Sequence, residues 1–339
     1  MSSTLRPAFR PTRHRACRPA RRRALIAVPV AALLALVPSS ATAYPAPGRV
    51  TGDVVVHDPT MVRTGAGKYL LYATGGGLGH RASGDRIAFA AGTDAFRTKP
   101  AWWARYSSVP EAWAPDLSYH GGRYVMYYSV SSFGSNNSAI GLATSATGEP
   151  GSWTDQGVVV TSSTSDDFNA IDPNLFVDDD GRWWLSYGSW WTGIKLIRLE
   201  PSTGKPHATD TARRSLASRP TGTKAVEAPS IVKRGGHYYL FASYDTCCAG
   251  SSSTYKVKVG RATRVTGPYV DRNGVPLMEN GGTPVLESHG RYIGPGGQSI
   301  MSDTDGDLIV YHYYDRDDNG TPKLGINLLD WSTGWPVAY

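Results

Sequence analysis

Hydrophobic and aromatic residues in this chain gather in short runs that are separated by glycine-containing turns. One unit of this pattern occurs five times, and each copy has a proline motif, a turn and an aromatic-rich run. The copies begin HDPTMV at His57, WAPDLS at Trp113, IDPNLF at Ile171, EAPSIV at Glu227 and, more divergently, GPGGQS at Gly294. No window shows sustained helical periodicity, so the runs are predicted to be strands.

The spacing of the repeat predicts the fold. Its prolines are 56, 58, 56 and 66 residues apart, at positions 59, 115, 173, 229 and 295. Each copy is followed by another strand-like stretch, at 86–91, 139–144, 194–199, 256–260 and 324–328. Several strands per period are typical of a β-propeller, whose blades surround a central axis. We therefore expect an all-β, five-bladed β-propeller over residues 44–339, with no room for a second domain.

Residues 1–43 are predicted to be a signal peptide. Eight arginines and no acidic residue accompany an apolar run at 24–37, which is too short to span a membrane and is followed by Ala-Thr-Ala at 41–43. Arg22-Arg23 also fits the twin-arginine export pattern, so both export routes stay open. The protein is expected to be secreted and extracellular.

Loss of this segment changes the charge and the cysteine count. The full chain carries a formal +7, and removing eight arginines leaves it near −1. Nucleic acids and anionic membranes are therefore not expected partners. Cys17 leaves with the signal, and the remaining Cys247 and Cys248 are adjacent. A vicinal disulfide and two buried thiols both stay open, but a disulfide framework is excluded.

Two acidic segments resemble calcium-binding loops, Asp178–Gly181 and Asp303–Gly306. They occupy the turn position of the repeat, and the further ligands of an EF-hand loop are missing. We interpret both as hairpin turns.

Three acidic residues stand at matched positions of the repeat. Asp58 and Asp172 precede the prolines of copies one and three, and Glu227 stands one residue further upstream in copy four. Because the first strand of each blade lines the channel of a propeller, these carboxylates are expected to converge on the axis. Like charges in a partly dry pocket raise one another's pKa, which is typical of catalytic sites. Two carboxyl groups of opposite protonation state are what glycoside hydrolysis needs.

The motifs HDP, IDPN and EAPS resemble those of glycoside hydrolase family 43, over essentially all of residues 44–339. The resemblance implies a five-bladed propeller that hydrolyses with inversion. It implies that Asp58 is the general base, that Glu227 is the general acid, and that Asp172 modulates the pKa of Glu227 and orients it. The segments WAPD, SSFGSNNSAIGLATS, NAIDPN, GSWWTGI, DTCCAG and VYHYYD resemble the endo-α-1,5-L-arabinanase branch.

This branch implies that the substrate is arabinan, as in the side chains of pectin, and that the enzyme acts as a monomer. The residues implied to bind it are His57, Trp113, Phe133, Gly134, Asn169, Ala170, Ile171, Ser189, Trp190 and Trp191. Strand alternation predicts that Trp190 and Trp191 face opposite ways, one into the core. VYHYYD implies that His312 helps to hold a hydrated calcium ion. A hydrogen-bonded core histidine in the third strand of copy five is the alternative.

Two segments depart from the family pattern. Gly297 stands where the family commonly has His after GPG, and residues 79–105, with Trp102 and Trp103, differ from what is expected beside the first blade. An exo-acting arabinanase, an arabinofuranosidase or a β-xylosidase on the same propeller is the first alternative. A non-catalytic glycan-binding propeller is the second, but the polar residues differ in each copy, which favours one asymmetric site. HExxH and GxSxG motifs are absent from the sequence.

Overall fold

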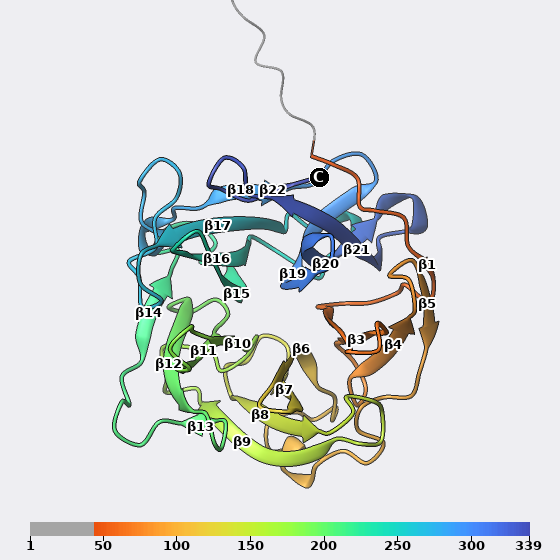
Figure 1. Ribbon diagram of the computed structural model, residues 1–339. Coiled ribbons are helices and arrows are strands. Elements are labelled where there is room, and N and C mark those ends of the chain that lie inside the picture. Colours follow the sequence, from red (N-terminus) through yellow and green to blue (C-terminus); the bar gives the residue numbers. More distant parts are fainter. Residues whose placement is uncertain (1–43) are drawn as a thin grey trace, which may run out of the picture. The chain divides into compact units, whose positions relative to one another are not determined.

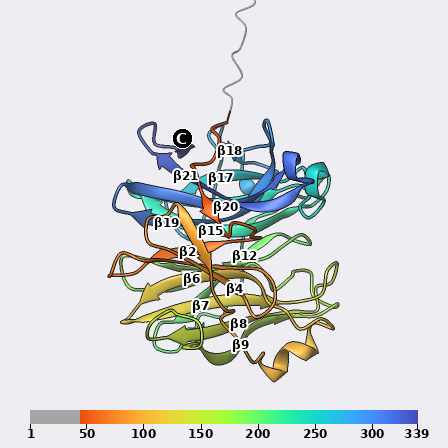
Figure 2. The ribbon, with the colours of Figure 1, turned by 90° about the vertical axis from the view of Figure 1, so that its right-hand side faces the viewer.

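The computed structural model describes residues 44–339, and the predicted signal peptide lies outside the described residues. The described chain forms five sheets arranged around a central axis (Figure 1). Figure 2 shows the ring from the side, with β20 and β21 near the top and β8 and β9 near the bottom. The prediction of an all-β, five-bladed propeller is confirmed.

In each blade, the strands that follow the proline motif pair in antiparallel fashion and run outward from the axis in sequence order. Blade 1 contains β2 (Thr60–Arg63), β3 (Tyr69–Ala73), β4 (Gly79–Ser83) and β5 (Ala88–Ala91), with β1 (Thr51–Gly52) at its edge. Blade 2 contains β6 (Trp113–His120), β7 (Arg123–Val130), β8 (Ser138–Ser145) and β9 (Thr154–Ser162). Blade 3 contains β10 (Asn174–Val177), β11 (Trp183–Tyr187), β12 (Ile194–Glu200), β13 (Lys205–Pro206) and β14 (Arg214–Ala217).

The last two blades continue the pattern. Blade 4 contains β15 (Val226–Arg234), β16 (His237–Tyr244), β17 (Lys256–Ala262) and β18 (Thr283–Leu286). Blade 5 contains β19 (Tyr292–Asp303), β20 (Gly306–Asp315), β21 (Thr321–Asp330) and β22 (Val337–Ala338). The helices of the described chain are short 3-10 turns: η1 (Ala101–Arg105), η2 (Gly250–Ser252), η3 (Leu277–Glu279) and η4 (Arg316–Asp318).

The hydrophobic core of the propeller is divided among the interfaces between neighbouring blades. The described residues form five buried clusters, and each joins two adjacent blades. Between blades 1 and 2, for example, Trp103 from η1 is fully buried and packs against Phe96 and Tyr128. Burying a large side chain in this way contributes about 1.5–3 kcal/mol. The divergent segment around Trp102 and Trp103 therefore extends the core between these blades.

The segment before blade 1 closes the ring. β1 pairs in parallel with β5, while Gly48 donates its backbone N–H to Ile326 O of blade 5 at 2.8 Å. Leu324 N in turn donates to Val54 O at 2.9 Å. The segment therefore bridges the first and last blades by main-chain hydrogen bonds.

The residue after the proline links each of the first three blades to the next. Thr60 Oγ1 accepts from Leu117 N at 3.0 Å, and Asp116 Oδ2 accepts from Leu175 N at 2.8 Å. In the same way, the side-chain oxygen of Asn174 accepts from the backbone of blade 4 at 2.9 Å. These buried bonds fix the inner strands relative to one another, which positions everything at the ends of those strands.

The structure settles several smaller expectations. Asp178 accepts from Lys233 and Tyr238 at the turn between β10 and β11, and Asp303 pairs with Arg86, so the hairpin-turn interpretation holds. Cys247 and Cys248 form a disulfide, and Cys248 is exposed. In the first copy, the stretch at 86–91 belongs to the fourth strand, because β4 precedes it. Among residues 44–339, no helix has the length and apolarity needed to cross a membrane.

Two expectations are wrong. Trp190 and Trp191 do not lie in a strand but in the turn between β11 and β12, with φ of 54° and 38°. Strand alternation therefore does not apply, and each is 37% exposed, so neither is a core residue. His312 lies in β20, the second strand of blade 5 rather than its third, and is fully buried.

Candidate active site

The residue before the repeated proline adopts an unusual backbone conformation in the first four blades. Its φ is 46° at Asp58, 41° at Ala114, 57° at Asp172 and 50° at Ala228. A residue with a side chain is strained at positive φ, by about 1–3 kcal/mol, and such strain gathers at functional sites. The cavity on the axis is lined by these four residues and by Gly297 of blade 5. Asp58 and Asp172 therefore contribute to one central cavity from blades 1 and 3.

Side chains from the preceding blade hold this strained backbone in place. Each N–H at the strained position, or at Gly297, donates to one acceptor. The five pairs are Asp58 N to His312 Nδ1 at 3.1 Å, Ala114 N to Thr74 Oγ1 at 2.8 Å, Asp172 N to Ser129 Oγ at 2.8 Å, Ala228 N to Asp172 Oδ2 at 3.1 Å and Gly297 N to Ser243 Oγ at 3.0 Å. His312 thus stands where other blades have a hydroxyl, and Asp172 supplies the acceptor that blade 3 otherwise lacks.

Glu227 reaches the same site from one residue further upstream. The pairing of β15 with β16 shifts register between Glu227 and Ser230, so the side chain of Glu227 stands before the strained residue Ala228. It is 7% exposed, and its Oε2 accepts from Ser189 Oγ at 2.6 Å. Glu227 therefore stands one residue before the strained position that Asp58 and Asp172 occupy, and its longer side chain reaches the same site.

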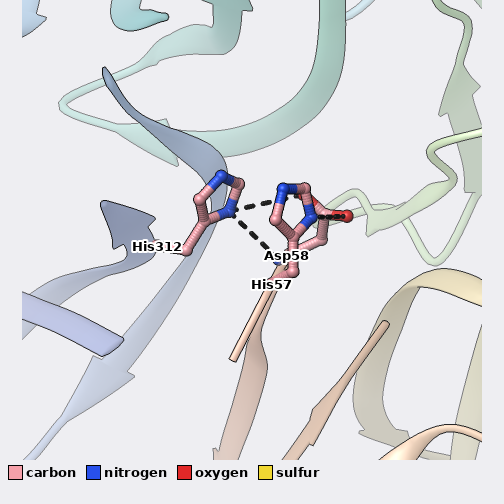
Figure 3. A group of neighbouring side chains, drawn as sticks. All are labelled: His57, Asp58 and His312. Carbon is pink, nitrogen blue, oxygen red and sulfur yellow. Dashed lines mark hydrogen bonds and ion pairs between the residues drawn. The ribbon is translucent and has the colours of Figure 1, made fainter. Parts of the chain in front are cut away.

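Asp58 is held as a carboxylate. Its Oδ2 accepts from Thr74 Oγ1 at 2.8 Å and contacts His57 Nδ1 at 2.7 Å, while His312 Nδ1 lies 3.5 Å from Oδ1 (Figure 3). Burial alone raises the pKa of Asp58, but the charge of His57 and the hydrogen bonds from His57 and Thr74 outweigh it and lower the pKa to about 2. Asp58 is therefore ionised at any pH at which the protein acts, and Oδ1 is its less encumbered oxygen.

Gly297 is required beside that oxygen. Its φ is 57°, and a Cβ there would lie 2.2 Å from Asp58 Oδ1 and 2.9 Å from the His312 ring. No side chain fits without displacing one of these two groups. The family commonly has His at this position, but the packing of Asp58 and His312 in this protein leaves room only for Gly297.

The pKa values of Asp172 and Glu227 are raised, whereas that of Asp58 is lowered. Burial raises the pKa of Asp172 well above its usual range, and the charges of Glu227 and Asp58 raise it further. Burial also raises the pKa of Glu227, with a contribution from Asp58, while hydrogen bonds from Ser189 and Tyr255 act against this. Since repulsion between two carboxylates is mutual, ionisation of one raises the pKa of the other. The site therefore combines an ionised carboxylate with a pair of carboxyl groups whose pKa values are raised.

The comparisons with known proteins agree with this geometry. The family profile described as "Glycosyl hydrolases family 43" matches residues 48–336. The chain belongs to glycosyl hydrolase family 43. It is 46% identical over 290 residues to the extracellular endo-α-(1→5)-L-arabinanase 1 of Bacillus subtilis (strain 168). The matched region covers 83% of this chain and 87% of that relative.

Two further proteins are similar to this chain. The extracellular exo-α-(1→5)-L-arabinofuranosidase ArbA of Cellvibrio japonicus (strain Ueda107) is 40% identical over 300 residues, covering 84% of this chain and 86% of the relative. The solved structure of the family 43 endo-arabinanase from Bacillus licheniformis has a TM-score of 0.81 and 46% identity, covering 85% of this chain and 99% of that chain. Membership of family 43 makes this protein a glycoside hydrolase.

Aromatic residues predicted to bind substrate lie at accessible positions. Phe133 is 85% exposed beside Gly134, which has a φ of 78°. Trp113 begins β6, is partly exposed and donates from Nε1 to Glu111 Oε1 at 2.9 Å. Together with the half-exposed Trp190 and Trp191, they offer apolar faces of the kind to which sugar rings bind.

The remaining predicted residues are less accessible. Asn169 is buried, accepts from Ser138 Oγ at 2.6 Å and donates to Ser135 O at 3.3 Å. Ala170 is fully buried, and its place in the lining of the groove stays a prediction. Ile171 is partly exposed, and Ser189 contacts Glu227. Asn169 therefore supports the loop that carries Phe133 from within.

Several site residues were not identified from the sequence. Thr74, Ser129 and Ser243 each stand within one residue of the end of the second strand of a blade, in the sequences YAT, YYS and FAS. The recurrence of a hydroxyl residue at this place in three copies could have identified them from the sequence. Tyr314, whose hydroxyl lies 2.8 Å from His57 Nε2, had no comparable signal because the two residues are 257 positions apart in the chain.

Ser189→Ala is expected to shift the pH profile of the enzyme. The hydroxyl stabilises ionised Glu227, so its loss raises the pKa of that residue further. A hydrogen bond to a charged group contributes about 1.5–3 kcal/mol, or roughly one pH unit or more. Because a general acid must be protonated, activity is lost as pH rises through this pKa, and the alkaline limb should move upward by about one unit.

The measurement is kcat/KM from pH 5 to 10. Ser332→Ala is the matched control, since Ser332 also donates to a carboxylate, Asp330, at 2.6 Å, but on the surface. An alkaline limb that stays in place, or moves to lower pH, would contradict the assignment of that limb to Glu227.

Proposed function

We propose that this protein is a secreted endo-α-1,5-L-arabinanase that hydrolyses arabinan with inversion. The observation that carries the proposal is the contrast between Asp58, ionised with a pKa of about 2, and buried Glu227, whose pKa is raised. The three blades that carry the acids belong to a family 43 chain that is 46% identical to an endo-arabinanase. The acids explain hydrolysis, and the relatives indicate the substrate.

The mechanism follows from these protonation states. An arabinan chain lies across the cavity, with its rings against exposed faces such as Phe133. Ionised Asp58 accepts a proton from a water molecule as that water attacks the anomeric carbon. Protonated Glu227 donates its proton to the oxygen of the leaving sugar. Because the water attacks from the face opposite the leaving group, the product has the inverted anomeric configuration.

Asp172 supports the acid in two ways. Its Oδ2 accepts from the backbone N–H of Ala228, the neighbour of Glu227, at 3.1 Å. Its carboxyl group is also close enough for Glu227 to raise its pKa. It therefore orients the strand that carries the acid, and its ionisation opposes that of Glu227.

The test is hydrolysis of linear, debranched α-1,5-arabinan, with product sizes and anomeric configuration followed over time. Early release of mixed oligosaccharides with inverted anomers is the expected result. Arabinose or one fixed short product from the start would identify an exo enzyme, as the 40% identical exo-acting relative would suggest. Binding of arabinan without cleavage would contradict the proposed function.

We also propose that residues 1–43 direct secretion. This is supported by their sequence and by the extracellular location of the Bacillus subtilis relative. Sequencing the N-terminus of protein recovered from the culture medium tests it, with Tyr44 as the expected first residue. The monomeric state, and the lack of nucleic acid and membrane partners, stay predictions.

We propose further that His312 contributes to a calcium site. Its buried Nε2 has no hydrogen-bond partner, and burial lowers its pKa well below the usual range, so the ring is neutral. With Nδ1 accepting from Asp58 N, the proton lies on Nε2. A metal on Nε2 fits the other tautomer, in which Asp58 Oδ1, 3.5 Å away, faces Nδ1–H. Water would supply the other ligands, and the ion would supply positive charge near the carboxylates.

Calcium is expected to stabilise the wild-type protein. At about a hundredfold excess over Kd, a single site contributes about 2.7 kcal/mol, or a rise in Tm of about 4 °C for a domain of this size. His312→Gln should not respond, whereas His237→Gln on β16 should respond like the wild type. An equal rise in Tm for His312→Gln, or none in the wild type after chelation and dialysis, would exclude this site.

A further inference from the structure

The Cys247–Cys248 disulfide lies in the loop between β16 and β17, beside the active site rather than in the core. Cys248 is exposed, and its Sγ lies 3.9 Å from His57 Nε2. Its backbone N–H donates to the Tyr314 hydroxyl at 2.8 Å. A loop of blade 4 therefore contacts residues of blades 5 and 1.

The contacts continue to the proposed base. The Tyr314 hydroxyl lies 2.8 Å from His57 Nε2, and His57 Nδ1 lies 2.7 Å from Asp58 Oδ2. In every proton arrangement that satisfies these contacts, Cys248 N–H donates to Tyr314 and His57 Nδ1–H donates to Asp58. The Nε2 contact is met by Nε2–H in the charged ring, whose pKa Asp58 raises, or by Tyr314 O–H in the neutral ring. His57 has the same orientation in both.

The surroundings leave these groups little freedom. Tyr314 is 3% exposed, and the His57 ring stacks on the His312 ring with centroids 3.8 Å apart. At the disulfide, a bond between adjacent side chains closes a small ring through their shared peptide, which restricts the backbone at Cys248. Cys248 also adopts a φ of 64°, which a residue with a side chain rarely adopts unless it is held there.

The same loop leads to the proposed acid. Ala249 N donates to Ser253 Oγ at 3.0 Å, and Tyr255, two residues later, is buried and hydrogen-bonded to Glu227. A Cβ on Gly320 of blade 5 would lie 2.5 Å from Ser251 N, so the loop also packs closely against that blade. The loop thus links blades 4, 5 and 1, which include both blades that carry the proposed acid and base.

We propose that the Cys247–Cys248 disulfide and Tyr314 are positioning residues that hold His57, and through it Asp58, in the orientation needed to activate water. This inference rests on the proposed function, in which Asp58 is the base. Neither group touches the reacting atoms, so their loss should lower kcat with little effect on KM. Since they act through one chain of hydrogen bonds, their effects should not add.

Three variants test the proposal with arabinohexaose as substrate. Tyr314→Phe should lower kcat about tenfold, since a base displaced by a fraction of an ångström loses much of its contribution, while KM stays within about twofold. The double variant Cys247→Ala/Cys248→Ala should show the same loss. Tyr311→Phe is the matched control, because Tyr311 lies on the same strand and its buried hydroxyl donates to Asn327 instead, at 2.8 Å. It should keep the wild-type kcat.

Reduction of the disulfide distinguishes positioning from a merely structural role. Dithiothreitol should lower the kcat of the wild type to that of Tyr314→Phe, and reoxidation should restore it. Tyr314→Phe and the cysteine variant should be insensitive to the reductant. The proposal is overturned if thiol titration shows full reduction while wild-type kcat is unchanged, or if Tyr314→Phe loses as much again on reduction.

Nitrogen-15 NMR of His57 separates this inference from the proposed function. Without substrate, and at a pH high enough for His57 to be neutral, the oxidised wild type should show one tautomer with the proton on Nδ1, and Tyr314→Phe or reduction should give a mixture. If no arabinan is hydrolysed but this change is seen, the positioning holds and the proposed function fails. If hydrolysis is found and the His57 spectrum is the same in all states, the positioning fails.

Discussion

Glu227→Gln is expected to lower kcat on debranched arabinan by about 10³–10⁴-fold. The amide has nearly the shape of the acid and can still accept from Ser189 Oγ, which now lies 2.6 Å from Oε2. It has no proton to give to the leaving oxygen, and general acid catalysis contributes up to about 10⁴-fold. Binding should be less affected, so KM should change by no more than a few fold. The measurement is kcat and KM with the purified variant.

The choice of leaving group shows whether Glu227 is the acid. An aryl arabino-oligosaccharide whose phenol has a low pKa leaves without protonation, so Glu227→Gln should cleave it within about tenfold of the wild-type rate. Glu279→Gln, a change at an exposed glutamate of η3, is the matched control and should behave as the wild type on both substrates. An equal loss on both substrates would show that Glu227 does not act as the acid.

The sequence was sufficient to predict the ring and its three acids because both depend on local patterns that recur. The proline motif sets the first strand of each blade, and Asp58, Asp172 and Glu227 were located by comparing copies. The copies also share a hydroxyl that supports the strained residue. The hydroxyls of Thr74 and Ser129 recur at the end of the second strand, where they accept from the strained residue of the next blade. His312 holds the equivalent place for Asp58.

What could not be predicted depends on contacts between blades or on unusual backbone conformations. Alternation placed Trp190 and Trp191 on opposite faces, but both have positive φ in a turn, where alternation does not hold. The state of Cys247 and Cys248 also stayed open, because adjacent cysteines form a disulfide only if the loop permits it. Tyr314 reaches His57 across 257 positions in the chain, so no local motif indicates the pair.

Asp58→Asn is expected to lower kcat by about 10³–10⁴-fold on arabinan and on the activated aryl substrate alike. Water must lose a proton as it attacks the anomeric carbon whichever group leaves, and an amide cannot accept that proton. The amide oxygen can still accept from Thr74 and His57, which now contact Oδ2 at 2.8 and 2.7 Å. The local structure should therefore persist, and a Tm within a few degrees of the wild type would verify this.

The same substitution has a second consequence with a defined sign. The charge of Asp58 raises the pKa of both Asp172 and Glu227, so its removal should lower both values. Carbon-13 NMR titration of the side-chain carboxyls should show both titrating at lower pH in Asp58→Asn than in the wild type. The contrast between variants then assigns the roles: Glu227→Gln recovers on the activated substrate, and Asp58→Asn does not. If Asp58→Asn recovered there as well, Asp58 would not be the base, and another residue at this cavity would have to activate the water.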